Sequence, residues 1–129
     1  MSRVLPQGTV LARLADLPDG DARVIDLAEE EFPPITGLLV RDGATVHAFL
    51  NRCPHAGRPL NFGSGNFLTP DGELLQCHAH GALFEKHTGL CVAGPCVDDS
   101  LRRLPVQVAE GEVRLAESLD IGTLSRGPW

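Results

Sequence analysis

Two short segments of this chain each place a cysteine close to histidine. In the first, Cys53 and His55 are separated by one residue; in the second, Cys77 is followed by His78 and His80. Thiolate sulfur and imidazole nitrogen bind zinc and iron, which makes metal ligation the first chemistry to consider. Each segment follows a predicted strand, and loops on a rigid sheet hold ligands in fixed positions.

The order of the ligands along the chain favours a dinuclear iron cluster over zinc. Two cysteines and two histidines satisfy tetrahedral zinc, but zinc fingers usually group cysteine with cysteine and histidine with histidine. Here each segment is mixed, and so each could give its thiolate to one iron and its imidazole to the other. Gly57 and Gly81 would let the backbone approach an inorganic core closely. A structural zinc module remains the alternative, and it predicts a colourless protein.

The two segments and their flanks resemble the Rieske [2Fe-2S] family, with its C-x-H and C-x-x-H motifs. The resemblance covers most of the chain and is weakest over residues 21–34 and the C-terminal tail. It is carried by residues 51–57, Cys77, His80, Gly81, Phe84, Thr88-Gly89, Gly94-Pro95, Leu101, residues 104–106 and Gly111, with further matches at residues 17–20 and 41–43.

The resemblance implies one Rieske-type 2Fe-2S cluster per chain, bound by Cys53, His55, Cys77 and His80. The positions of Gly81 and Phe84 favour His80 over His78. The implied fold is all-β, a Rieske-like antiparallel β-sandwich or barrel. It would form a single domain over residues 1–129, with a small cluster-binding subdomain of two hairpin loops at approximately residues 51–98.

Several departures from the family pattern bear on the cluster. Between His55 and Cys77 lie 21 residues, a long spacer that a hairpin over residues 67–76 would absorb. Arg58 and Ala79 stand where high-potential members carry a disulfide, Ala82 stands where they carry serine, and the chain has no tyrosine. Fewer hydroxyl donors to the cluster sulfurs predict a reduction potential near the low end of the Rieske range, about −150 mV.

The resemblance also implies a function as an electron carrier. We expect a ferredoxin that passes single electrons from an NAD(P)H-dependent flavin reductase to a terminal oxygenase, often one that hydroxylates aromatic rings. The alternatives are a Rieske small subunit of another complex, such as nitrite reductase, and a redox-sensing regulatory domain. No catalytic residues are expected, because the chain has neither a G-x-G-x-x-G nucleotide loop nor a P-loop lysine.

The composition of the chain limits the classes of partner that it is expected to bind. The 129 residues carry a formal charge of −6, which argues against nucleic acid or an anionic membrane as the main partner. No apolar run approaches the ~20 residues that cross a bilayer. The N-terminus lacks the apolar segment of a signal peptide, so we expect a cytoplasmic protein. The oligomeric state, monomer or homodimer, stays open.

The remaining sequence predicts short strands separated by Gly, Pro and Asp. Asp42-Gly43 is a strong hairpin signal. A helical turn is expected at residues 120–125, and residues 29–34 should form a solvated connector. Strands are predicted over residues 9–14, 22–27, 35–41, 44–50, 67–69, 73–76, 82–85, 90–93, 104–108 and 112–116.

A few residues could serve chemistry but have simpler interpretations. Cys91 and Cys96 could form a small disulfide or shield the cluster, although buried thiols are the expectation for a cytosolic protein. His47 is expected at the surface or core edge of a strand, and His87 in a solvated turn. A basic rim near the cluster, for docking a partner, would consist of Arg52, Arg58 and Lys86.

Overall fold

The computed structural model describes residues 4–28, 35–52, 68–69, 71–77, 81–94, 97 and 99–120. Within these ranges the chain forms short strands and one 3-10 helix. In chain order they are β1 (Val4–Leu5), β2 (Val10–Arg13), η1 (Leu14–Asp16), β3 (Ala22–Ala28), β4 (Ile35–Asp42), β5 (Thr45–Leu50), β6 (Leu74–Gln76), β7 (Leu83–Glu85), β8 (Cys91–Ala93), β9 (Val106–Ala109), β10 (Glu112–Leu115) and β11 (Leu119–Asp120).

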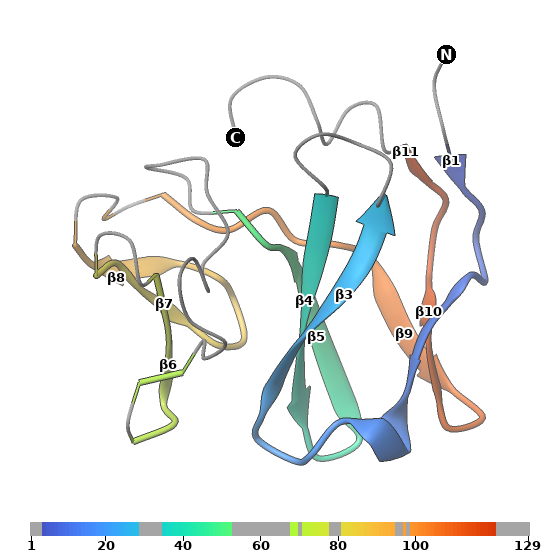
Figure 1. Ribbon diagram of the computed structural model, residues 1–129, viewed down its shortest axis with the longest axis horizontal. Coiled ribbons are helices and arrows are strands. Elements are labelled where there is room, and N and C mark those ends of the chain that lie inside the picture. Colours follow the sequence, from blue (N-terminus) through green and yellow to red (C-terminus); the bar gives the residue numbers. More distant parts are fainter. Residues whose placement is uncertain are drawn as a thin grey trace.

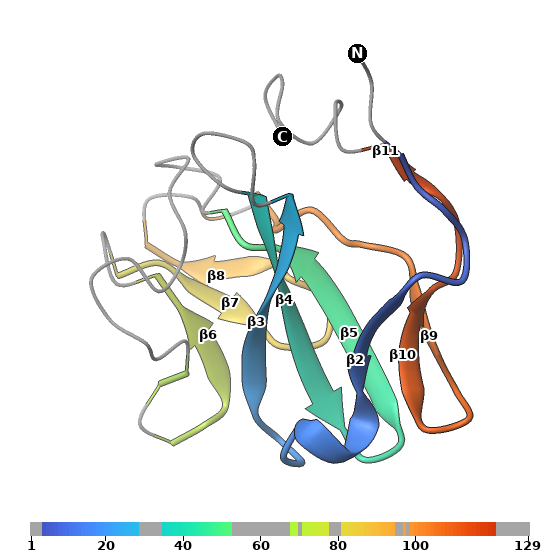
Figure 2. The same ribbon diagram turned by 45° about the vertical axis from the view of Figure 1, so that its right-hand side comes forward.

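The described strands are antiparallel and group into three three-stranded sheets and one ribbon. The sheet orders are β3-β4-β5, β2-β10-β9 and β6-β7-β8, and β1 pairs with β11. Figure 1 shows the β3–β5 sheet in the middle, the β6–β8 sheet on its left and β9 and β10 on its right. Figure 2 keeps this order after the rotation. No helix in the described part is long and apolar enough to cross a membrane.

Strand β4, in the centre of the middle sheet, is buried on both faces, and its side chains alternate between those faces. In β4, Leu38 pairs with Phe49 and Leu39 pairs with Ala48 of β5, and all four are at most 1% exposed. Leu38 and Phe49 belong to one hydrophobic core, and Leu39 and Ala48 to the other. The apolar run in β4 therefore reflects a strand with a core on each side.

Each core joins the middle sheet to one neighbour. The first core contains Leu39 with Val113 and Leu115 of β10. The second contains Phe49 with Leu75 of β6 and Phe84 of β7. The β6–β8 sheet is thus held to the middle sheet by apolar side chains that are fully removed from water, which is the dominant favourable contribution to folding.

The structure confirms the all-β antiparallel fold class and most of the predicted strands. The long spacer before Cys77 contains β6, and a bridge between Leu68 and Leu75 supports the predicted hairpin there. The expected helical turn is wrong at its first residue, because Asp120 is in β11 and pairs with Val4. Residues 121–125 of that turn and the connector at 29–34 lie outside the described residues.

A glycine in the β7–β8 turn shows how closely the two sheets approach. Gly89 has φ of +76°, and a Cβ atom placed there would lie 2.9 Å from Cε1 of the Phe49 ring. Phe49 is fully buried and cannot move away without disturbing the second core. Only glycine combines this backbone conformation with this contact.

We predict that Gly89→Ala lowers the free energy of unfolding by about 1–3 kcal/mol more than Gly111→Ala does. Gly111 is a matched control, because its φ is +74° and a Cβ there would meet nothing within 4 Å. Both variants bear the cost of a left-handed alanine, but only the first also overpacks the core. Chemical denaturation checks this, and equal losses in the two variants would contradict the packing described for Phe49.

Candidate metal centre

The first predicted ligand segment begins at a fixed point just after β5. The Asn51 side chain is buried, and its Nδ2 donates to Oγ1 of Thr36 at 3.1 Å. The Asn51 backbone N–H donates to the Thr36 carbonyl at 3.0 Å, and the Leu50 N–H donates to the Arg102 carbonyl at 2.8 Å. These bonds hold the strand end that leads to Cys53, so the segment starts from a rigid position.

The second segment begins at Cys77, which directly follows β6. The backbone N–H of Cys77 donates to the Ala82 carbonyl at 2.8 Å, and the Gly81 N–H donates to the Cys77 carbonyl at 2.8 Å. The chain thus leaves the sheet at Cys77 and returns to it at Gly81, before β7. These hydrogen bonds fix Cys77 and Gly81, the residues at the two ends of the predicted ligand loop.

A third segment packs against the return of this loop. Gly94 follows β8, and a Cβ atom placed on it would lie 2.8 Å from Cα of Ala82. Ala82 is itself fully buried. A side chain at position 94 would therefore push on the backbone beside Gly81. Gly94 is one of the residues that carry the family resemblance, and Pro95, which follows it, lies outside the described residues.

The second hydrophobic core brings together the strands that lead to the two ligand segments. It contains Phe49, near the end of β5, and Cys77 itself. Cys53, His55, His78 and His80 lie outside the described residues. Of the four predicted ligands, the structure therefore places Cys77 and the strand end that precedes Cys53, and the assembled set of four stays a prediction.

The chemistry at Cys77 fits a metal cluster. Its thiol is fully buried and makes no disulfide. A lone thiolate there would carry a large desolvation cost, which a positively charged metal core would offset. In an oxidised 2Fe-2S cluster with two thiolates and two neutral imidazoles, the ligand charges balance the core charge, and a neutral assembly suits an apolar site.

The structure describes two of the three residues of the expected basic rim, Arg52 and Lys86, and both make contacts that bear on a docking role. Lys86 Nζ donates to the carbonyls of Gly20 and Gly72, each at 2.9 Å, so this lysine ties three loops together. Burial lowers the pKa of Arg52, whose side chain is half-buried. Arg58 lies outside the described residues. Lys86 therefore has a structural role, and docking by the rim as a whole stays a prediction.

The expectation that Cys91 is buried is confirmed, since it is 2% exposed. Its Sγ lies 3.2 Å from the Ala93 carbonyl and donates a hydrogen bond to it. Cys96 lies outside the described residues, so its pairing stays open.

One group of possible ligands was missed by the sequence analysis. Asp42, His47 and His87 bring one carboxylate oxygen and two imidazole nitrogens within 4.8 Å of one another. The β4–β5 hairpin signal could have indicated that Asp42 and His47 share a face. Nothing local in the sequence indicates that His87 packs beside them.

Comparison with known proteins identifies the family. The model of the Rieske [2Fe-2S] domain matches residues 7–114. Ferredoxin CarAc of Metapseudomonas resinovorans is 33% identical over 78 residues, which cover 60% of this chain and 67% of that protein. Oxidoreductase NdmD of Pseudomonas putida is 37% identical over 59 residues, 46% of this chain, but the chain spans only 9% of that longer protein.

A solved structure supports the same assignment. The ferredoxin of carbazole 1,9a-dioxygenase from Nocardioides aromaticivorans IC177 is 28% identical, with a TM-score of 0.66, over 86% of this chain and 98% of that one. The match therefore includes nearly the whole of a ferredoxin. This chain belongs to the Rieske [2Fe-2S] domain family, and a 2Fe-2S cluster is its cofactor.

Proposed function

We propose that this protein is a ferredoxin that carries single electrons on its Rieske cluster. It receives them from an NAD(P)H-dependent flavin reductase and delivers them to a terminal oxygenase that hydroxylates aromatic rings. The observation that carries this proposal is the match over 98% of the ferredoxin of a carbazole dioxygenase. The same match covers 86% of this chain.

The proposed cluster ligands are Cys53, His55, Cys77 and His80. Cys77 supports this assignment through its buried thiol at the start of a closed loop. His80 directly precedes Gly81, where the chain returns to β7. The cluster supplies one-electron chemistry, and the role of the chain is to hold its ligands in fixed positions and keep water away from the Cys77 side.

The charges of the chain suit repeated electron transfer. Two thiolates lower the formal charge from −6 to −8, and two ferric ions with two sulfides restore −6; one electron then gives −7. The site changes only from neutral to −1, so fixed backbone N–H groups can stabilise both redox states. A carrier of this kind works without a substrate pocket of its own, and we place it in the cytoplasm.

Changing His80 to Ala is expected to abolish the visible absorption of the mixed-ligand cluster, whereas His78→Ala is expected to preserve it. The reason is that only His80 serves as an iron ligand in the proposed register. Absorption spectra of the two variants, purified without oxygen and reconstituted with iron and sulfide, check this. The reverse pattern would show that His78 is the ligand.

The reduction potential is expected near −150 mV, at about the low end of the Rieske range. Ala82 cannot donate a hydroxyl hydrogen bond to the cluster, and the chain contains no tyrosine. A spectroscopic redox titration measures this value. A potential above about +100 mV would contradict it, since that range needs additional donors to the sulfurs.

Electron delivery is tested by stopped-flow mixing with a flavin reductase and then with a ring-hydroxylating oxygenase. The wild-type protein should accept one electron per chain and pass it on, and the His80→Ala variant should do neither. If the protein instead binds a partner with an affinity that depends on its redox state but transfers no electrons to it, it is a sensor and the carrier function is wrong.

A further inference from the structure

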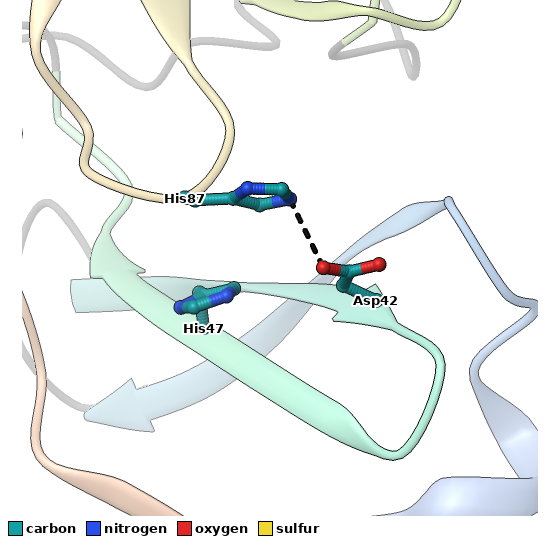
Figure 3. A group of neighbouring side chains, drawn as sticks. All are labelled: Asp42, His47 and His87. Carbon is teal, nitrogen blue, oxygen red and sulfur yellow. Dashed lines mark ion pairs between the residues drawn. The ribbon is translucent and has the colours of Figure 1, made fainter.

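Two imidazoles and a carboxylate meet at the seam between the middle sheet and the β6–β8 sheet. Asp42 ends β4, His47 lies in β5, and His87 lies in the turn between β7 and β8. Figure 3 shows the His87 ring above Asp42, with His47 beside them on the hairpin. None of these residues belongs to the proposed cluster ligands or lies within the two ligand segments.

The register of the hairpin explains why Asp42 and His47 share a face. Asp42 pairs with Thr45 and Val40 pairs with His47, and residues paired across or two apart along antiparallel strands point to the same side. This is the face that carries the second core. His87 reaches it from the opposite sheet, because the β7–β8 turn packs on Phe49 through Gly89.

We propose that Asp42, His47 and His87 form a binding site for a divalent transition-metal ion of the zinc type, separate from the iron-sulfur cluster. Two imidazole nitrogens and one carboxylate oxygen are a ligand set that zinc accepts, with water as the fourth ligand. The chain's net charge of −6 favours a cation over an anion at its surface.

The distances between the donor atoms are close to those that zinc requires. Zinc ligands lie about 2.0–2.2 Å from the metal, which puts two tetrahedral ligands about 3.3–3.6 Å apart. His87 Nε2 and Asp42 Oδ2 are already 3.4 Å apart. All three donors lie within 4.8 Å of one another, and the two rings have centroids 5.0 Å apart at an angle of 31°. A shift of His47 by about 1 Å completes the site.

The three side chains differ in how freely they can make this adjustment. His87 and Asp42 are 51% and 59% exposed, and His47 is half-buried. A hollow of about 220 Å³ opens beside His47, between β5 and the segment from Arg103 to Val106. Neither Asp42 nor His87 lines this hollow, so the exposed side chains of Asp42 and His87 have the greater freedom to adjust.

The backbone that carries these side chains is held in place before any metal binds. The Gly43 N–H donates to Asp19 Oδ1 at 2.8 Å, which fixes the hairpin next to Asp42. An Arg103 guanidinium nitrogen donates to the His87 carbonyl, which fixes the β7–β8 turn. A site on such a base loses little conformational entropy when it binds its ion.

The groups around His47 act on its pKa in both directions. Burial first, and then the positive charges of His87 and Arg103, lower the pKa of His47, while Asp42 acts in the opposite direction. The Arg103 charge opposes the cation, but its guanidinium is engaged at the His87 carbonyl and lies over the Phe49 ring at 5.9 Å.

The test measures zinc binding to the cluster-loaded protein. Calorimetry gives the affinity, and metal analysis after desalting gives the amount of zinc that stays bound. The variants are Asp42→Asn, His47→Gln and His87→Gln. Asp26→Asn is the matched control, because it removes the same charge from an exposed position on the same sheet. We expect one zinc per chain in the wild type and the control. Even partners of metal ligands cost about 10- to 100-fold in affinity when removed, and each ligand variant should lose at least that much.

Two further measurements separate this site from the cluster ligands and from a simple Asp42–His87 ion pair. Zinc should shift the NMR signals of His47 and His87 while the visible spectrum of the cluster stays unchanged, and it should raise the unfolding temperature of the wild type but not of the three variants. The proposal is overturned if zinc bleaches the cluster, if the wild type retains no zinc, or if all four variants bind it equally.

Discussion

The structure depends on one strand, β4, that is buried on both of its faces. Leu38 and Leu39 are adjacent in β4, yet they point into different hydrophobic cores. One core joins this strand to the β2-β10-β9 sheet, and the other joins it to the β6–β8 sheet, which leads to Cys77. Since Phe49 fills the second core and is fully buried, any change in the spacing of the two sheets would also move the ligand loop.

This packing also fixes the position of the backbone around the proposed metal centre. The chain leaves a short sheet at Cys77 and returns to it at Gly81, with hydrogen bonds at both ends, so the backbone sets the position of Cys77, the proposed ligand. An electron carrier benefits from ligands that change little between redox states. The same seam between sheets brings His87 to the hairpin that carries Asp42 and His47, and so one packing interface underlies both sites.

Local signals in the sequence were sufficient for the β4–β5 hairpin, and the resemblance to the Rieske family was sufficient for the cofactor. The turn at Gly43 is marked by its own residues, and Cys77 is marked by its distance to a histidine. The pairing of Val4–Leu5 with Leu119–Asp120 could not be predicted, because two-residue strands show no alternation and their partners are over 100 residues apart. The approach of His87 to the middle sheet depends on how two cores pack, which no local pattern encodes.

The central claim is that the cluster contains two iron ions. Two cysteine sulfurs bind one of them, and two histidine nitrogens bind the other. Pulsed EPR of the reduced protein, labelled with ¹⁵N-histidine, tests it most directly. The account predicts one unpaired electron per chain, coupled to two histidine nitrogens, and two irons per chain by metal analysis. A signal without histidine coupling would indicate all-cysteine ligation, and a single metal ion per chain would indicate a mononuclear site; either would contradict the account.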